Sequence, residues 1–582
     1  MVILKVLVLV GALGFFLFGM KLMSESLQKV AGHKMRSILS AMTSNRFKGI
    51  FTGFLVTTMI QSSSATSVML VSFVNAGLIP LIQAVGVVMG INIGTTVTAW
   101  LISILGFKVS LSALSLPLIG LALPLFFSAS DKRKTWGEFV VGFAILFLGL
   151  QALKEAVPDI KSNPELLVFL SNYTDFGYLS VIIFVLVGTI LTIVIQSSSA
   201  TMALTLVLCY NGLIPFHIAA AMVLGENIGT TITANLAAIV GNSNAKRTAR
   251  AHFIFNIIGV IWMLIFFFPF IKGISLLLEY YSGVSILENL SNNNFEQVKE
   301  LLPISLALFH TAFNIINSIL LIAFVPKIAD MTKYLVSKKA EDDDDDIHLQ
   351  TIKSGFVSTS EMSIFQAEKE IQLFAKQIEK MLANVYNLID KHDRKLTLKA
   401  IKKMKKQEDL ADSNMETLSL NLAKISQGHI SDQSAKEMKA FFRINNELES
   451  IGDSCYKIAS RIERNMGNKL FFKKDLRNHL KQMYQLLLKA YDLMQQGLEQ
   501  NTNKDLFDKA FELELQINTK RDELLLELML QINEKEVNFE TGLVYKDVIS
   551  SFEKIGDYIM NIHEAMSDPK IIGLSKYEPV ES

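Results

Sequence analysis

The sequence predicts an all-α protein with a polytopic membrane half, built from two inverted repeats with one re-entrant helical hairpin each, and a cytoplasmic half of two three-helix bundles. Charge is the first observation. Only 19% of the 582 residues are charged, and residues 49–130 and 176–245 contain one charged residue each, Lys108 and Glu226. The second is a motif pair that occurs twice. The third is that residues 361–568 lack proline and place apolar residues at helical spacing.

The membrane half is predicted from its apolar stretches, because a helix needs about 20 mostly apolar residues to cross a bilayer. Two stretches, 49–77 and 178–212, are interrupted by the polar run QSSSAT. Broken backbone at membrane depth is tolerated only where protein or a water-filled cavity covers it, so both are expected to be re-entrant hairpins. The candidate full spans are residues 2–20, 81–104, 109–129, 136–152, 216–240, 251–271 and 301–325.

Loop charges predict the orientation of these spans. Basic loops face the cytoplasm, and the loops rich in Lys and Arg are 21–48, 132–134, 246–250 and 327–339. The loops 153–177 and 272–300 carry more carboxylates than lysines and are expected outside. This places the amino terminus outside and the polar half in the cytoplasm. Residues 2–20 lack a basic start and a small-residue cleavage site, so we expect a retained span rather than a signal peptide.

The membrane half contains an internal repeat at an offset of 135 residues. The run QSSSAT at 61–66 returns at 196–201, and GINIGTT at 90–96 returns as GENIGTT at 225–231. Three full spans separate the two hairpins, and an odd number inverts the second copy. We therefore expect repeats at about 10–130 and 140–271 and an extra span at 301–325, within a membrane domain of residues 1–330. Inverted repeats with discontinuous helices are typical of secondary transporters.

The repeated motifs predict a binding site for an anion together with cations. A half-helix starting at a hairpin tip offers backbone N–H groups, serine hydroxyls and a glutamine amide to an anion. The neutral oxygens of the second motif suit a hard cation such as sodium. No arginine lies in these motifs, so the charge of a buried anion must be balanced by cations that enter with it. The candidates are Gln61, Ser62, Ser63, Ser64, Thr66, Asn92, Thr95 and Thr96 in the first copy, and Gln196, Ser197, Ser198, Ser199, Thr201, Asn227, Thr230 and Thr231 in the second.

Glu226 stands where the first repeat has Ile91. A carboxylate inside a membrane span is a candidate functional group, either a cation ligand or a proton site. The alternative is a protonated glutamate that is hydrogen-bonded between helices. Two further pairs, His252 with Asn256 and His310 with Asn314, share the spacing H-x-x-x-N and are expected to form interhelical hydrogen bonds.

The doubled QSSSAT and G-x-N-I-G-T-T motifs resemble the bacterial form of the type II sodium–phosphate cotransporter family, over about residues 10–325. The resemblance implies sodium-dependent movement of inorganic phosphate in the plasma membrane of a bacterial cell. It also implies that both tips, with Asn92, Thr95, Asn227 and Thr230, form the phosphate and sodium sites. Sodium is then the coupling ion.

The polar half is predicted to follow an acidic linker, residues 331–354, and to end before a tail, residues 571–582. Residues 355–570 divide into six long helices, which two three-helix bundles accommodate. This half is also duplicated: E-x-I-G-D occurs at Glu449–Asp453 and again at Glu553–Asp557. Carboxylates four residues apart share a helix face and repel, so a cation or a basic partner would relieve them. The alternative is an ordinary solvated acidic face.

The repeated E-x-I-G-D resembles PhoU domains, across about residues 355–568. The resemblance implies a phosphate-responsive regulatory module that binds a divalent or transition metal. The carried-over ligands are Glu408, Asp412, Glu449, Asp453, Glu514, Glu553 and Asp557. A cytoplasmic signalling protein is an expected partner.

Three functional readings follow for the whole chain. The leading one is a sodium–phosphate symporter with an attached regulator, in contact with the lipid bilayer and able to form a homo-oligomer. An exporter with the same site and a membrane-tethered phosphate sensor are the alternatives. An enzyme is not expected, because the chain lacks a phosphate-cradling GxxxxGK[ST], an H-E-x-x-H and a G-x-S-x-G. A net charge of +1 gives no reason to expect nucleic acid as a partner.

Overall fold

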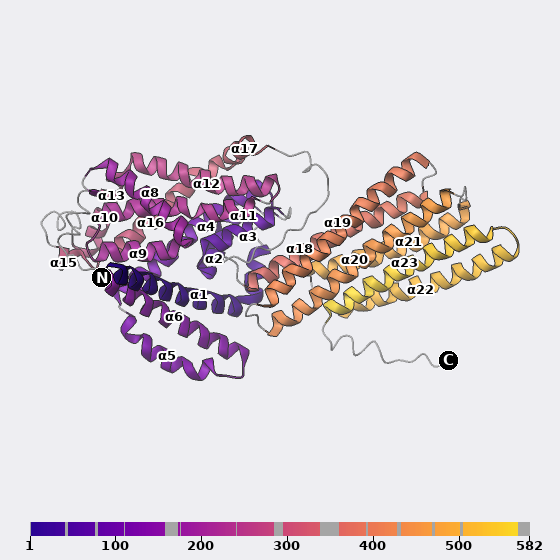
Figure 1. Ribbon diagram of the computed structural model, residues 1–582, viewed down its shortest axis with the longest axis horizontal. Coiled ribbons are helices and arrows are strands. Elements are labelled where there is room, and N and C mark those ends of the chain that lie inside the picture. Colours follow the sequence, from indigo (N-terminus) through magenta and orange to yellow (C-terminus); the bar gives the residue numbers. More distant parts are fainter. Residues whose placement is uncertain are drawn as a thin grey trace. The chain divides into compact units, whose positions relative to one another are not determined.

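All regular elements are helices in the part of the chain that the computed structural model describes (Figure 1). The described residues are 2–40, 45–75, 79–109, 111–157, 173–174, 176–239, 241–284, 295–337, 360–390, 394–427, 432–467, 472–500 and 504–567. The chain separates into two compact units, residues 1–343 with 353–362, and residues 344–352 with 363–582. Residues 338–354 of the predicted linker and the predicted tail 571–582 lie outside the described residues.

The first unit contains the predicted membrane helices. Its first part comprises α1 (Val2–Ser40), α2 (Arg46–Ile60), α3 (Ser63–Asn75), α4 (Leu81–Leu101), the π-helical η2 (Ile102–Lys108) and α5 (Ser112–Phe126). The second part comprises α6 (Asp131–Ala156), α8 (Tyr178–Ile195), α9 (Ser198–Tyr210), α10 (Phe216–Gly229), α11 (Thr231–Ala238) and α12 (Ser243–Ile265). The remaining helices are α13 (Phe267–Ser282), α15 (Phe295–Val298), α16 (Leu302–Leu321), η4 (Ile322–Phe324) and α17 (Val325–Leu335).

Six helical stretches of the described chain are long and apolar enough to cross a membrane, where seven full spans were predicted. They are Leu4–Val30, Leu81–Lys108, Asp131–Ala156, Tyr178–Ile195, Ser243–Ile265 and Leu302–Leu335. The predicted span 109–129 is instead the 15-residue α5, which contains two prolines. The predicted span 216–240 is interrupted at Thr230, between α10 and α11. The loop predicted at 21–48 also needs correction, because α1 continues to Ser40.

The two copies of the repeat make reciprocal contacts. Helices α1 and α6 lie side by side in Figure 1, and the close approaches between them join Gly19 to Leu146 and Gly149 to Phe16. These four residues form two pairs with the same offset of 130. Gly19 thus contacts the counterpart of Phe16, and Phe16 contacts the counterpart of Gly19. Such reciprocal contacts are those of two copies related by a twofold axis. Inversion across a membrane remains a prediction.

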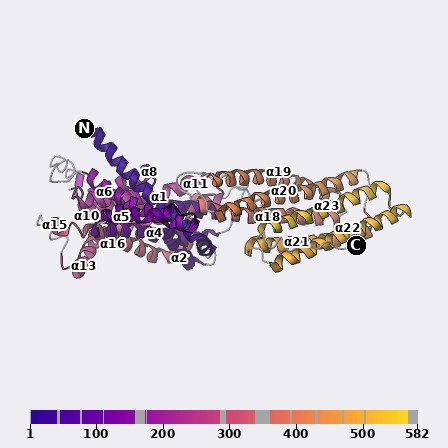
Figure 2. The same ribbon diagram turned by 90° about the horizontal axis from the view of Figure 1, so that it is seen from below.

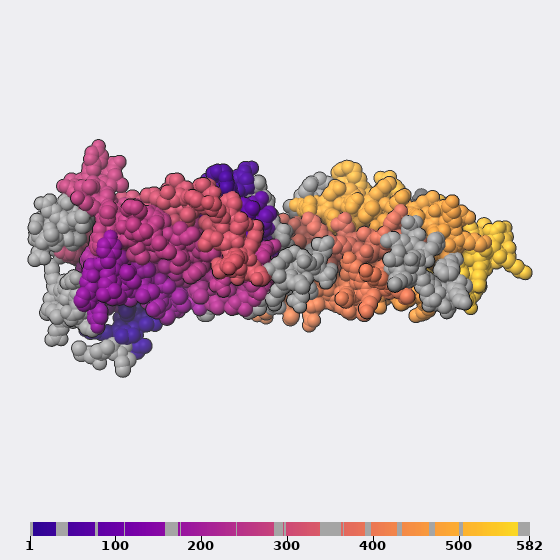
Figure 3. All heavy atoms as spheres, turned by 90° about the horizontal axis from the view of Figure 1, so that it is seen from above, coloured from indigo at the N-terminus to yellow at the C-terminus, as the bar shows by residue number. Residues whose placement is uncertain are grey.

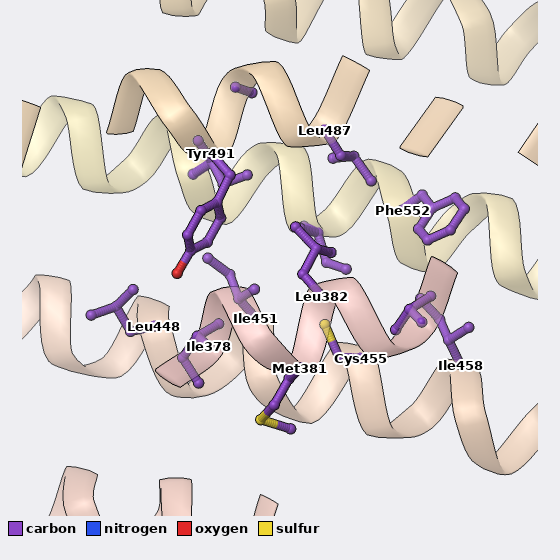
Figure 4. Close-up of a cluster of buried hydrophobic side chains, with 14 of the residues drawn as sticks. Ile378, Met381, Leu382, Leu448, Ile451, Cys455, Ile458, Leu487, Tyr491 and Phe552 are labelled. Carbon is purple, nitrogen blue, oxygen red and sulfur yellow. The ribbon is translucent and has the colours of Figure 1, made fainter. Parts of the chain in front are cut away.

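The second unit consists of the six predicted helices. They are α18 (Ser360–Asp390), α19 (Arg394–Ser426), α20 (Asp432–Gly467), α21 (Lys474–Gln500), α22 (Lys504–Asn533) and α23 (Phe539–Met566), which run as long rods in Figure 2. One buried apolar cluster draws on all six of them. Figure 4 shows Ile378 of α18, Ile451 of α20, Tyr491 of α21 and Phe552 of α23 within this cluster.

The two predicted three-helix bundles therefore share a core. Helix α20 packs against α23, and the Tyr491 hydroxyl donates a hydrogen bond of 2.6 Å to the Ala375 carbonyl of α18. Charged residues occupy the exposed faces of these amphipathic helices. Figure 3 shows the atoms of this unit in orange to yellow. Burial of one apolar stripe per helix holds such bundles together.

Candidate functional site

Both polar runs break a helix in the same way. Helix α2 ends at Ile60 and α8 at Ile195, and the glutamine that follows each, Gln61 or Gln196, adopts left-handed backbone with φ of 53° or 57°. In the described chain only one other non-glycine residue, Lys535, has positive φ. Left-handed backbone at a non-glycine residue is strained, and such strain concentrates at functional sites. Each polar run thus separates two helices, as predicted, while a re-entrant course of either pair stays a prediction; α8 by itself is long enough to span a membrane.

A serine caps the half-helix that follows each break. The Ser62 hydroxyl accepts a hydrogen bond from the Ala65 amide at 3.2 Å, and the Ser197 hydroxyl accepts one from the Ala200 amide at 3.3 Å. A helix leaves its first four N–H groups without intrahelical partners, and each cap satisfies one of them. Helices α3 and α9 therefore begin directly after these serines, at Ser63 and Ser198.

The two tips meet. The Ser63 and Ser198 hydroxyl oxygens lie 3.1 Å apart, and both side chains are buried. The two serines are equivalent in the repeat. A residue that contacts its own counterpart lies on the twofold axis, so the two breaks converge at the centre of the repeated structure. Both tips thus contribute to one polar centre.

The second motif has the same local hydrogen bonds in both copies. Asn92 and Asn227 each donate a side-chain hydrogen bond to the carbonyl four residues earlier, and Thr95 and Thr230 do the same. Each hydroxyl hydrogen is thereby used within the helix, so the oxygen lone pairs remain for another donor or a cation. Thr96 and Thr231, and Thr66 and Thr201, repeat this pattern of hydroxyl donation to a nearby carbonyl.

The glycines of this motif allow close packing both in α4, which runs unbroken through its motif, and in α10, which ends at Gly229 within its motif. A Cβ at Gly90 would overlap the Ile50 carbonyl oxygen of α2, and one at Gly225 would overlap the Val185 carbonyl oxygen of α8. Helix α4 continues through its motif to Leu101. The glycines bring the motif helix against the half-helix that leads to the break.

The two tips differ in their surroundings. Gln61 is 8% exposed, and its side-chain oxygen accepts a hydrogen bond of 2.8 Å from the Thr98 hydroxyl. Gln196 is exposed. The Ser24 hydroxyl of α1 also donates to the Ile60 carbonyl, directly before the first break. The glutamine of the first tip is therefore buried and that of the second is exposed.

Some of these contacts were missed in the sequence. Thr98 has a counterpart at the same offset, Thr233, so the repeated motif extends two residues past G-T-T and could have identified it. Ser24 and Ser67 lie outside any repeated motif and carry no such signal.

Two buried histidines, His252 and His310, contact the helices that carry the repeated motifs. The His252 ring of α12 is 3.4 Å from the Ser67 hydroxyl of α3, and the His310 ring of α16 is 3.4 Å from the Asn227 side-chain oxygen. The predicted interhelical role of both histidines is confirmed. Asn256 and Asn314 instead donate to the His252 and His310 carbonyls within their own helices. His310 therefore contacts a predicted site residue directly.

The acidic residues of the second unit form two clusters, as the repeat suggested. Burial raises the pKa of Asp412, and the neighbouring carboxylates Glu408 and Asp453 raise it further. Burial likewise raises the pKa of Glu449, with Asp453 and Asp412 adding to it. In the second cluster, burial and then the charge of Asp557, Glu564 and Glu553 raise the pKa of Glu514, and burial and then Glu553 raise that of Asp557.

As placed in the described chain, these clusters do not form a metal site. Among the described residues, no group of three or more His, Cys, Asp or Glu side chains is arranged to hold one. Basic side chains contact the predicted ligands instead: Lys405 lies 2.7 Å from Glu408, Lys457 2.5 Å from Asp453, and Arg521 2.5 Å from Glu553. Two of these pairs lie within a single helix and Arg521–Glu553 joins α22 to α23, while neighbouring carboxylates still raise the pKa of Asp412, Glu449, Glu514 and Asp557. A metal at these carboxylates stays a prediction.

Comparison with protein families matches both halves. The Na+/Pi-cotransporter family model matches residues 15–155 and 166–287, which include both polar runs and both copies of the second motif. The PhoU domain model matches residues 371–462 and 480–566, which cover most of the six helices of the second unit. No solved structure matches the chain.

Similar proteins come from bacteria and animals. YjbB of Escherichia coli (strain K12), whose name provisionally describes it as an inorganic phosphate export protein, is 23% identical over 488 residues, 83% of each chain. The uncharacterized protein YqeW of Bacillus subtilis (strain 168) is 32% identical over 255 residues, 43% of this chain and 79% of YqeW. Sodium-dependent phosphate transport protein 2A of Rattus norvegicus is 36% identical over 107 residues, 18% of this chain and 16% of the rat protein.

Family and fold agree. The six apolar helices and the match to a transporter family make this a multi-pass membrane protein. The chain belongs to the Na+/Pi-cotransporter family and carries a PhoU domain in its second half.

Proposed function

We propose that this protein moves inorganic phosphate across a membrane together with sodium, through a site centred where the two tips meet. The observation that carries the proposal is the 3.1 Å contact between Ser63 and Ser198. It joins equivalent positions of two broken helices, as a shared site between repeats requires. The Na+/Pi-cotransporter match and the rat sodium-dependent relative support phosphate and sodium as its ligands.

The chemistry of the motif residues supports cation coupling. Serine hydroxyls at the start of α3 and α9 donate to phosphate oxygens, and helix N-termini favour an anion. Threonine and asparagine oxygens of the second motif offer lone pairs to sodium. In the described chain, no hydrogen bond or ion pair joins a Lys or Arg to Ser63, Ser198, Asn92 or Asn227. Sodium then supplies the positive charge that the doubly charged anion needs.

Phosphate export is the second candidate, because YjbB resembles this chain over 83% of both proteins. Binding sites of a symporter work in either direction, and the gradients set the net flow. The PhoU domain, expected in the cytoplasm, would regulate this flow or report phosphate to a signalling protein.

Labelled-phosphate flux in proteoliposomes tests the proposal. The full-length protein should take up phosphate faster with an inward sodium gradient than with an inward potassium gradient. Ser63→Ala and Ser198→Ala should each weaken the apparent phosphate affinity about tenfold, which corresponds to the loss of one charged hydrogen bond. Ser72→Ala is the control, since its hydroxyl bonds the Val68 carbonyl within α3. Flux that ignores sodium would reject the coupling, and absence of any phosphate flux would favour a sensor.

A further inference from the structure

The two halves of the site differ by one buried carboxyl group. Glu226 of α10 is 1% exposed and precedes Asn227 of the second motif. Its counterpart in the first copy is Ile91, which is also fully buried. Around these positions both copies have the same close glycine contacts and the same Asn and Thr hydrogen bonds. The carboxyl is the one charged group by which the two motifs differ, beside the break at Thr230 and the His310 contact with Asn227.

One oxygen of the Glu226 carboxyl is buried without a partner. Its Oε2 atom has no hydrogen bond in the described chain. The alternative of a glutamate that is hydrogen-bonded between helices finds no support at this oxygen. The Thr230 hydroxyl, one turn further along, bonds the Glu226 backbone carbonyl and not the carboxyl group.

No basic group of the described chain compensates this carboxyl. Helix α10 packs against α8, α9, α11, α12 and α16. The titratable or charged residues on these helices and on α10 are Tyr178, Cys209, Tyr210, His217, Lys246, Arg247, Arg250, His252 and His310. None of them makes an ion pair or hydrogen bond with Glu226. The nearest contacts of the two buried histidines go to Ser67 and Asn227.

An unpaired buried carboxylate is costly, by several kcal/mol even after relaxation, so it must take up a proton or a cation. From this geometry we propose that Glu226 binds one coupling cation, sodium or a proton, that the first copy does not bind. The proposal rests on phosphate–cation cotransport. As a consequence, the protein moves one more positive charge per phosphate than a variant with isoleucine at position 226 would move.

Charge-coupled flux in proteoliposomes tests this assignment in the full-length protein. The variants are Glu226→Gln and Glu226→Ile, the second of which installs the residue of the first copy. Glu279→Gln on α13, outside the repeated motifs, is the matched control. Phosphate uptake and the accompanying current are measured under a sodium gradient alone and under a pH gradient alone.

The expected result is that both Glu226 variants move one positive charge fewer per phosphate than the parent and the control. If the ion is sodium, phosphate uptake under the sodium gradient depends less steeply on sodium concentration in the variants. If it is a proton, the variants lose only the uptake driven by the pH gradient. An unchanged charge ratio, sodium dependence and pH response in both variants would overturn the proposal. A parent protein without phosphate flux would instead reject the proposed function.

Cation binding without transport provides a second measurement, in case the variants carry no phosphate. The melting temperature of the purified full-length protein is measured against sodium concentration at two pH values. A ligand that binds the folded state raises the melting temperature. Both Glu226→Gln and Glu226→Ile should show a smaller rise in melting temperature, with sodium or with acid, than the parent and Glu279→Gln show. Retention of the full shift in both Glu226 variants would also overturn the proposal.

Discussion

Glu370 is a buried carboxyl group at the start of the second unit. Its oxygens accept hydrogen bonds from Gln366 at 2.9 Å and from Asn421 of α19 at 3.3 Å. Burial outweighs these bonds and raises its pKa from 4.5 to about 7. Between these values the folded state holds the proton more tightly than the unfolded state. Folding stability should therefore fall as pH rises through this window, in total by about 3 kcal/mol.

Hydrogen exchange tests this pH dependence. We expect amide protection factors in α18 and α19 of the full-length protein to be lower at pH 8 than at pH 6, after correction for intrinsic exchange rates. Glu370→Gln should remove most of this difference, because the amide cannot ionise. Glu416→Gln, at an exposed position of α19, is the control. A pH difference that Glu370→Gln leaves intact would contradict the assignment.

Repetition made the two helix breaks predictable. QSSSAT and G-x-N-I-G-T-T identified the helix breaks and the residues around Ser63 and Ser198, because two copies in register exclude chance patterns. Residues that contact the site from unrepeated positions could not be found this way. His310 illustrates the limit: its spacing predicted an interhelical bond, but only the fold brings α16 to Asn227.

Helix packing against the motif depends on the absence of a side chain at Gly90 and Gly225. Alanine at either position would push α2 from α4 or α8 from α10. Overpacking of this kind costs about 1–3 kcal/mol. We expect Gly90→Ala and Gly225→Ala to lower the melting temperature of the purified protein and to reduce phosphate flux.

Gly120→Ala in α5 is the matched control, since its Cβ would meet no atom within 4 Å. Alanine is a better helix former than glycine, so this variant should melt at the same temperature or slightly higher. Equal melting temperatures for all three variants would show that the close approaches do not stabilise the repeats.

At the level of elements, apolar length predicted most helices but not their ends. Six long apolar helices are present in the described chain where seven full spans were predicted, because two predicted spans are shorter or interrupted helices and one predicted hairpin half is long enough to count. The interruption at Thr230 and the 15-residue length of α5 account for the first two, and Tyr178–Ile195 for the third. The six helices of the second unit were easier to predict, because amphipathic spacing without proline leaves few alternatives to a helix. Their common core was not predicted, since sequence periodicity does not tell which helix faces which.

At the level of the whole molecule, the membrane unit has its own apolar core, separate from that of the second unit. A chain truncated before residue 341 should therefore fold and still move phosphate down its gradient in proteoliposomes. The comparison is with the full-length protein at equal protein density. Monodisperse truncated protein without flux would instead assign a required role in transport to the PhoU domain.

The central claim is that Ser63 and Ser198 meet in one phosphate site. The most direct test replaces both by cysteine in a chain that also carries Cys209→Ala and Cys455→Ala, since both native cysteines are buried and free. Disulfides form only between closely placed side chains. Mild oxidation in membranes should cross-link the pair and stop phosphate flux, reductant should restore flux, and phosphate with sodium should slow the cross-linking. Absence of a cross-link, or undiminished flux through the cross-linked protein, would contradict the account.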